Sequence, residues 1–147
     1  MNQSAPTRLR PDFRRFLQRA GLRPTRQRAA LAEMLFKGDR HVTAEELHME
    51  ASAAGSRISL ATVYNTLHHF REAGLVRELA IEGSRTYFDT NTSNHNHFYF
   101  EDRHDVVDIP GNEIGLNNLP KAPEGYEIAH VDVVIRLVPT RAATTKA

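Results

Sequence analysis

The sequence predicts an α+β protein in which a helical first half precedes a strand-rich second half. Up to Gly74, apolar side chains recur at the spacing of helices, between residues typical of helix starts and ends. Beyond Gly74 they alternate as in strands. The charge changes too: residues 1–80 carry 13 Lys/Arg against 8 Asp/Glu, and residues 81–147 carry 6 against 10. We therefore expect two small domains, the first basic and the second acidic.

Two short helices are predicted at the start of the chain. One covers Asp12–Ala20 and ends before Gly21, and the next covers Thr25–Leu35 and follows Pro24. Residues 1–28 hold eight arginines and one acid. Such a segment is attracted to phosphate whatever the base sequence, although a solvated basic tail is a common alternative.

Two further helices are predicted on either side of a short turn. Residues 43–54 open with a capping box, in which Thr43 and Glu46 satisfy each other's backbone N–H groups. The turn at 56–58 then leads to Ser59, which suits the first position of the second helix. A helix, a short turn and a second helix together predict a helix-turn-helix.

The helix after Ser59 has two distinct faces, because residues follow one another at about 100° around a helix. Its narrow apolar stripe consists of Leu60, Val63, Leu67 and Phe70. The opposite face, flanked by Tyr64, holds Ala61, Thr62, Asn65, His68 and His69. Small, hydrogen-bonding and aromatic groups suit a helix that enters a DNA major groove. An ordinary amphipathic surface helix is the alternative that periodicity alone leaves open.

A β-hairpin is predicted next. Residues 75–81 and 85–89 read as strands, and the turn at 82–84 contains a glycine. Helices followed by such a hairpin predict a winged helix-turn-helix domain over residues 1–89.

Composition excludes several classes of protein. The 147 residues include no cysteine, which rules out disulfides, thiolate metal sites and thiol catalysis. No apolar run is long enough to span a membrane, and the basic N-terminus lacks the apolar core of a secretory signal. No nucleotide-binding glycine loop or nucleophile elbow is present. We expect a cytoplasmic protein with no membrane partner.

The second half concentrates histidines and carboxylates. His95 and His97 lie two residues apart and would share one face of a strand, with Asp89 before them and Asp108 after the strand. Two imidazoles with a carboxylate can bind one metal ion. Histidines that are simply solvated are the alternative for a lone H-x-H. The aromatic run 98–100 fits a core or interface better than a cofactor site.

A last strand is predicted over residues 127–138. Val131, Val133, Ile135 and Leu137 alternate onto one face of it. The second half is too small for a comfortable core of its own, and pairing of two copies would bury its apolar surface. We expect an αβ dimerisation and effector-binding domain over 90–140, followed by a disordered tail at 141–147.

These segments resemble the ferric uptake regulator family of bacterial metal-responsive repressors. The resemblance rests on AGLRPTRQRAAL at 20–31, HVTAEELH at 41–48, ISLATVYNTL at 58–67, FREAGLV at 70–76 and the YFD motif before H-x-H. It implies a winged helix-turn-helix DNA-binding domain followed by a small αβ dimerisation domain. It also implies a homodimer that binds double-stranded operator DNA and is not an enzyme.

The resemblance implies one retained metal site for a divalent ion such as Fe, Mn or Zn. Every position of this site holds a residue able to ligate: His41, Asp89, His95, His97 and Asp108. An ion held by residues of both domains would fix the angle between them, and so the spacing of the two reading helices.

Two other family sites are implied to be lost or weakened. The second metal site would fall on Asn94, Asn96, Gly115 and Val131, with Glu113 and His130 nearby. The first cysteine pair of the structural zinc site matches Phe100 and Arg103, so no four-cysteine zinc is expected.

These departures resemble the iron response regulator branch of the family. The branch is implied to act under iron limitation and to be inactivated by haem, which His95 or His97 could bind and a haem-delivering enzyme could supply. A divalent-metal-dependent repressor is the alternative. A small metal-binding enzyme that uses the His/Asp cluster, and constitutive DNA binding with a vestigial site, also stay open.

The resemblance also implies a set of DNA contacts. Tyr64 matches a tyrosine that contacts bases, and Asn65 stands where arginine is frequent. The full set of candidate DNA-binding residues is Arg23, Arg26, Arg28, Ser59, Thr62, Tyr64 and Asn65.

Overall fold

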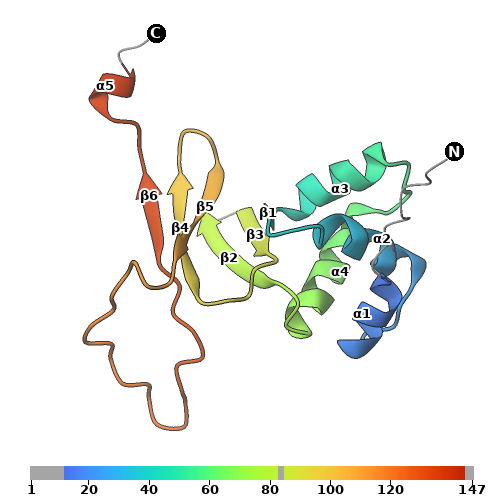
Figure 1. The fold of residues 1–147 in the computed structure, drawn as a ribbon, viewed down its shortest axis with the longest axis horizontal. Coiled ribbons are helices and arrows are strands. Elements are labelled where there is room, and N and C mark those ends of the chain that lie inside the picture. Colours follow the sequence, from blue (N-terminus) through green and yellow to red (C-terminus); the bar gives the residue numbers. More distant parts are fainter. Residues whose placement is uncertain (1–11, 83–84, 145–147) are drawn as a thin grey trace, which may run out of the picture. The chain divides into compact units, whose positions relative to one another are not determined.

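The computed structural model describes residues 12–82 and 85–144, and confirms the α+β fold class (Figure 1). The chain forms two compact units that divide between Thr92 and Ser93. None of the described helices is long and apolar enough to cross a lipid bilayer.

The first two helices begin where the sequence predicts. Helix α1 (Phe13–Arg19) is capped by Asp12, whose carboxylate accepts from the N–H groups of Arg14 and Arg15. Helix α2 (Arg26–Leu35) is capped by the hydroxyl of Thr25. These side chains satisfy backbone donors that have no partner within a first helical turn.

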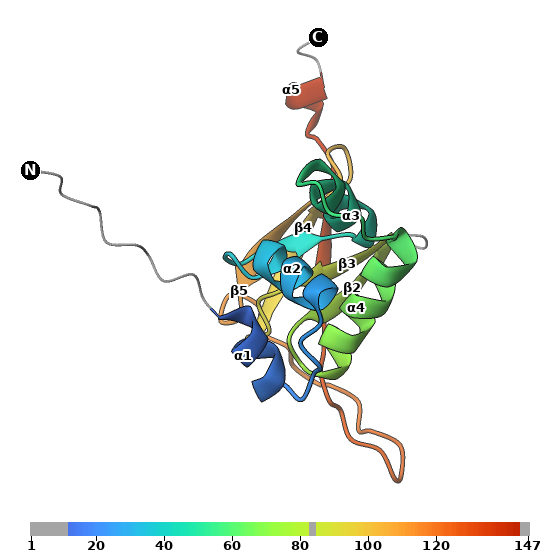
Figure 2. The ribbon, with the colours of Figure 1, turned by 90° about the vertical axis from the view of Figure 1, so that its right-hand side faces the viewer.

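The predicted helix-turn-helix consists of α3 (Ala44–Ala53) and α4 (Leu60–Glu72). The capping box at Thr43 is formed, and Gly74 adopts the positive φ of +75° expected just after a helix. Helix α3 packs against both α2 and α4, and Figure 2 shows the helices of this unit from the side.

The wing is a three-stranded antiparallel sheet, one strand more than predicted. Strands β2 (Arg77–Glu82) and β3 (Arg85–Asp89) form the expected hairpin, while the centre of its turn, residues 83–84, lies outside the described residues. The additional strand β1 (His41–Val42) pairs with β3, so the order is β1-β3-β2. A two-residue strand has no periodicity, which is why the sequence alone does not predict it.

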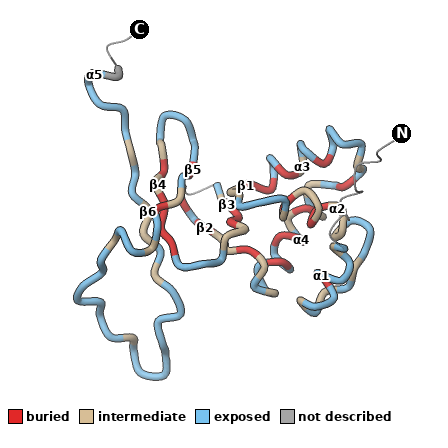
Figure 3. The backbone as a smooth tube through the Cα atoms, viewed as in Figure 1, coloured by how far each residue is buried: buried red, intermediate tan, exposed pale blue. Residues whose placement is uncertain are grey.

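One apolar core holds the first unit together. It is built on the predicted stripe of α4, in which Leu60 is partly buried and the other three residues are fully buried. Figure 3 shows the buried positions of α2, α3 and α4. The largest fully buried apolar side chains of this core are Leu17, Leu31, Leu35, Leu47, Leu67, Phe70 and Phe88.

The second unit contains a mixed three-stranded sheet of order β5-β4-β6. Strand β4 (His95–Phe100) pairs antiparallel with β5 (Asp105–Pro110) and parallel with β6 (Val134–Leu137). Residues 111–133 join β5 to β6 without a helix or strand. They form the open orange loop of Figure 1.

Three details differ from the predictions. The strand predicted over 127–138 is only β6, because the alternating residues before it belong to the loop. Asp108 follows the H-x-H strand β4, as predicted, but lies within a further strand, β5, that the sequence did not predict. The tail predicted to be disordered begins with a short helix, α5 (Arg141–Thr144), and residues 145–147 lie outside the described residues.

Candidate metal centre and nucleic-acid interface

The first pair of candidate metal ligands is formed by strand pairing within the wing. His41 of β1 lies opposite Asp89 of β3, and residues opposite each other in an antiparallel pair place their side chains on the same face. The Nε2 atom of His41 is 3.2 Å from Oδ2 of Asp89. The other carboxylate oxygen of Asp89 accepts from the N–H of Asn91 at 2.9 Å.

Arg40, which directly precedes His41, ties the His41–Asp89 pair to helices α2 and α3. Its backbone exchanges hydrogen bonds with Thr90, through N–H to Oγ1 at 3.0 Å and from the N–H of Thr90 to its carbonyl at 3.1 Å. Its guanidinium donates to the carbonyl of Met34 and to the carboxylate of Glu50 on α3. The hydrogen bond to Glu50 raises the pKa of Arg40, although partial burial opposes this.

A second group of candidate ligands is formed by β4 and β5. His97 lies opposite Asp108, and His95 is two residues away on the same face. Both Nε2 atoms are 3.4 Å from Oδ1 of Asp108. One ligand atom from each of the three residues lies within 4.8 Å of the others. Two imidazoles and a carboxylate so placed suit Zn²⁺, Fe²⁺ or Mn²⁺.

The histidines are not solvated, so the alternative interpretation of the H-x-H motif is wrong. His95 is 4% exposed and His97 is fully buried. The Nδ1 atom of His95 lies 2.7 Å from the carbonyl of Ser93 and donates to it, so the neutral ring has on Nε2 the lone pair that a metal needs.

Residues at the positions of the lost sites have other roles. Asn96 is buried, and its Oδ1 accepts from the N–H of Val133 at 3.2 Å, which ties β4 to the start of β6. The guanidinium of Arg103 lies 4.0 Å from the ring centre of Phe100, where the resemblance places a cysteine pair. A cation–π contact thus occupies that position.

The hydroxyl of the predicted DNA contact Ser59 takes part in capping α4. It accepts from the N–H of Thr62 at 3.2 Å and donates to Oγ1 of Thr62 at 2.9 Å. Thr62 and Asn65 lie on the same face of α4, one half-buried and the other exposed.

Tyr64 is linked to the preceding helix. Its hydroxyl donates to Oε1 of Glu45 at 2.5 Å, and this hydrogen bond is the main reason why the pKa of Tyr64 lies above its ordinary value of 10.0. Glu45 is not among the predicted site residues. Its position in the first turn of α3, facing α4, becomes apparent only when the two helices are packed.

The three predicted arginines have different surroundings. Arg28 donates to the carbonyl of Arg23 at 3.0 Å, and its Nη2 lies 3.0 Å from Nδ1 of His69 on α4. Arg26 lines a different hollow, together with Asp12 and Glu33. The structure therefore brings Arg28 together with Thr62 and Asn65 and does not bring Arg26 to them. His69 lies on the predicted polar face and is not among the predicted site residues.

Known proteins are similar to this chain over most of its length, including the winged helix-turn-helix and the His/Asp group. The model of the ferric uptake regulator family matches residues 19–136. The chain belongs to the ferric uptake regulator family. The peroxide-responsive repressor PerR of Staphylococcus aureus (strain Mu50) is 34% identical over 115 residues, which are 78% of each chain.

Solved structures of the ferric uptake regulator family share the fold. The Pseudomonas aeruginosa ferric uptake regulator with manganese has a TM-score of 0.67 and 27% identity, and the match covers 86% of this chain and 97% of that one. The ferric uptake regulator of Vibrio cholerae has a TM-score of 0.68 at 24% identity, over 87% of this chain and 100% of that one. These relatives are transcriptional regulators.

Proposed function

We propose that this family member is a metal-responsive transcription regulator that binds operator DNA as a homodimer. The observation that carries the proposal is the arrangement of His95, His97 and Asp108 on β4 and β5, in a chain whose first unit is a winged helix-turn-helix. A regulator is proposed in preference to a metal enzyme because the similar proteins are regulators.

The effector that best suits these residues is a single divalent ion, Fe, Mn or Zn. Imidazole nitrogen and carboxylate oxygen are ligands that all three accept, and none of them requires the thiolates that this chain lacks. We propose that His41 and Asp89 complete the ligand set. Ligands from both units would make the angle between the units depend on the ion, and the ion must bind one angle better than others to have any effect.

DNA binding is proposed for the exposed face of α4. The helix is 13 residues long and presents Thr62 and Asn65 away from its buried stripe, with the half-buried Tyr64 on the flank. An α-helix of this kind fits the major groove of B-DNA. The excess of arginine at the start of the chain adds attraction to phosphates that is independent of sequence.

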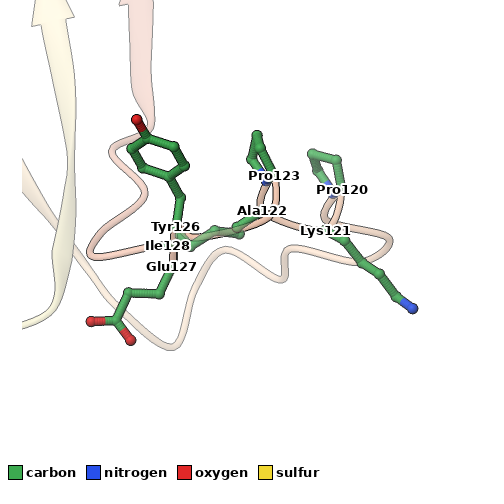
Figure 4. Close-up of a pocket in the computed structure, with 7 residues that line it drawn as sticks. All are labelled: Pro120, Lys121, Ala122, Pro123, Tyr126, Glu127 and Ile128. Carbon is green, nitrogen blue, oxygen red and sulfur yellow. The ribbon is translucent and has the colours of Figure 1, made fainter.

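Pairing of two copies is proposed through the second unit, which exposes many apolar side chains. The loop 111–133 forms a hollow lined by two prolines, Ile128 and the ring of Tyr126, which is 78% exposed (Figure 4). Exposed apolar surface of this kind marks an interface more often than a free surface. The exposed large apolar residues of this unit are Val107, Leu116, Leu119, Tyr126, Ile128, Ile135 and Val138.

Haem is the second candidate effector, as in the branch that acts under iron limitation. The imidazoles of His95 and His97 are chemically suited to haem iron. Both are buried beside Asp108, so haem would have to draw one of them out of the group. Divalent metal therefore fits the folded arrangement better, and haem would act by competing with it.

The test is binding of the purified full-length protein to an operator selected from random duplexes. Mn²⁺, Zn²⁺, Fe²⁺ without oxygen, a chelator and haem are compared, with metal analysis of the protein as isolated. Affinity that rises with a divalent ion and falls with the chelator supports the proposal. A Soret band together with loss of binding on adding haem would favour the second candidate, and affinity that ignores all of these ligands would end the sensing proposal.

A further inference from the structure

We infer that a hollow between the start of α2 and the exposed face of α4 is a built site for one backbone phosphate of the DNA. The inference rests on the proposed function. The hollow has a volume of about 230 Å³ and contains Arg28 at its wall. Its lining residues are Thr25, Gln27, Arg28, Thr62, Asn65, Thr66 and His69.

The lining chemistry suits an anion. It includes one fixed cation, several groups that can donate hydrogen bonds, and no carboxylate. Three other hollows of the same unit each contain at least two carboxylates, such as Glu33 with Glu50 or Glu45 with Glu46. Those carboxylates offset the basic residues beside them, Lys37 and Arg40 in one hollow and Arg14 and Arg26 in another, whereas here no carboxylate opposes the charge of Arg28.

Arg28 is held in place before any ligand arrives. Its Nη1 donates to the carbonyl of Arg23 and its Nη2 to Nδ1 of His69, both at 3.0 Å. A guanidinium has five N–H groups, so others remain for a ligand. Because Nδ1 of His69 accepts this hydrogen bond, the neutral ring carries its proton on Nε2 and is a second donor.

The other polar groups are also arranged as donors. The hydroxyl of Ser59 donates to Oγ1 of Thr62, so the hydrogen of the Thr62 hydroxyl points elsewhere. Among residues 12–82 and 85–144, no hydrogen bond satisfies the side-chain amides of Gln27 and Asn65. Thr62, Asn65 and His69 follow one another at spacings of three and four residues, so all three line the same side of the hollow.

A DNA phosphate fits the place of the site better than a free ion. The hollow borders the exposed face of α4 at Thr62 and Asn65, while Tyr64 lies on the other flank of that face, about 160° around the helix from Thr62. Contacts to the DNA backbone on one flank fix the register in which a side chain on the other flank reads bases. Asn65, which stands where the family frequently has arginine, is then assisted by Arg28 from helix α2 and by His69 from the next turn of α4.

The test uses the full-length protein and the selected operator, with affinity measured against salt concentration. Arg28→Ala should weaken binding to operator and unrelated duplex alike, and lower the slope of log affinity against log salt by about 0.9. His69→Leu should likewise weaken binding to the operator and to unrelated duplex. His69→Gln should bind DNA nearly as wild type, because glutamine can accept a hydrogen bond from Arg28 and donate one to the phosphate. Arg103→Ala, which removes one positive charge from the second unit, is the matched control and should leave affinity and slope unchanged.

A scan of single neutral methylphosphonates along the operator locates the phosphate. A neutral linkage at one position should weaken binding by the wild type and should not weaken binding by Arg28→Ala any further. Operator binding that is the same in Arg28→Ala, His69→Leu and wild type would overturn the inference and leave the proposed function standing. No binding of wild type to any duplex would instead contradict the proposed function. Calorimetry with inorganic phosphate alone is the remaining arm: Arg28-dependent uptake with a flat methylphosphonate scan would make this a free-anion site and overturn the inference.

Discussion

The hydroxyl of Tyr64 donates a hydrogen bond to Oε1 of Glu45 at 2.5 Å, so the reading helix and the helix before it share a contact at the exposed face. Glu45 lies in the first turn of α3, and the same helix is held by Arg40 through Glu50. Arg40 directly precedes the candidate ligand His41. The orientation of the Tyr64 ring thus depends on a helix whose position is tied to the strand that carries the candidate ligand His41.

We expect Glu45→Ala to reduce the discrimination of operator from unrelated DNA, because the ring of Tyr64 loses its fixed orientation. Glu45→Gln should preserve discrimination, since the amide oxygen still accepts from the tyrosine, and should bind all DNA more tightly because a charge that repels phosphate is gone. The ratio of the two affinities at fixed salt is the measurement. Equal ratios in wild type and Glu45→Ala would show that the contact does not position Tyr64.

The same contact predicts a pH dependence of stability. The hydrogen bond to Glu45 raises the pKa of Tyr64 above 10.0, because ionisation would break the bond and place two anions together. The hydrogen bond therefore contributes its full share to the free energy of unfolding below pH 10.0. That share is lost as pH rises through the higher pKa of Tyr64 in the folded state. The free energy of unfolding in urea should fall more steeply above this pH for wild type than for Glu45→Ala. Parallel curves of this free energy against pH would contradict the prediction. Ultraviolet titration should find the tyrosine pKa lowered in the variant.

The sequence predicts the helices of this fold well because their signals are local. Asp12, Thr25, Thr43 and Ser59 cap helices where hydroxyl or carboxylate groups precede an apolar periodic segment. Strand β1 was missed because its two residues form a strand only by pairing with β3, far along the chain. The prediction of one strand over 127–138 was wrong for the residues before Val134, because alternation of apolar residues does not show whether a partner strand is present.

Metal affinity should depend on His97 far more than on a histidine that lies outside the candidate metal group. His97→Ala removes a ligand atom 3.4 Å from Asp108, and we expect at least a 10-fold to 100-fold loss of metal affinity. His130→Ala is the matched control, because His130 pairs with Asp132 at 2.9 Å outside this group. Competition with a metal-binding dye measures both. Similar affinities in the two variants would remove His97 from the site.

Only part of the candidate site could be recognised from sequence. The motif H-x-H places His95 and His97 on one face of a strand, which spacing alone predicts. That Asp108 faces them depends on the register of β4 with β5, and registers are set by packing. The position of Asp108 after the strand made it one of two candidate carboxylates, and the resemblance to the family added it to the ligand set. The contacts of Glu45 and His69 depend on helix packing and had no sequence signal of comparable strength.

Arg40 should stabilise the first unit by its hydrogen bonds more than by its charge. Arg40→Ala removes donors to the carbonyl of Met34 and to Glu50, and we expect a loss of about 1 kcal/mol in free energy of unfolding, because the pair is partly exposed to solvent. Arg40→Lys should recover only part of it, since an ammonium cannot form the two-pronged contact. Urea unfolding gives the values, and a lysine variant as stable as wild type would show that charge alone suffices.

The linker before the H-x-H motif should be sensitive to a single methyl group at Gly111. A Cβ atom there would lie 2.4 Å from the carbonyl oxygen of Asn94, which is too close unless the backbone shifts. We expect Gly111→Ala to destabilise the protein by about 1–3 kcal/mol and to weaken metal binding, because Asn94 directly precedes His95. Gly115→Ala meets no described atom within 4 Å and is the control. Thermal unfolding and metal competition on both variants test this, and identical behaviour would mean that residues 94 and 111 can move apart without cost.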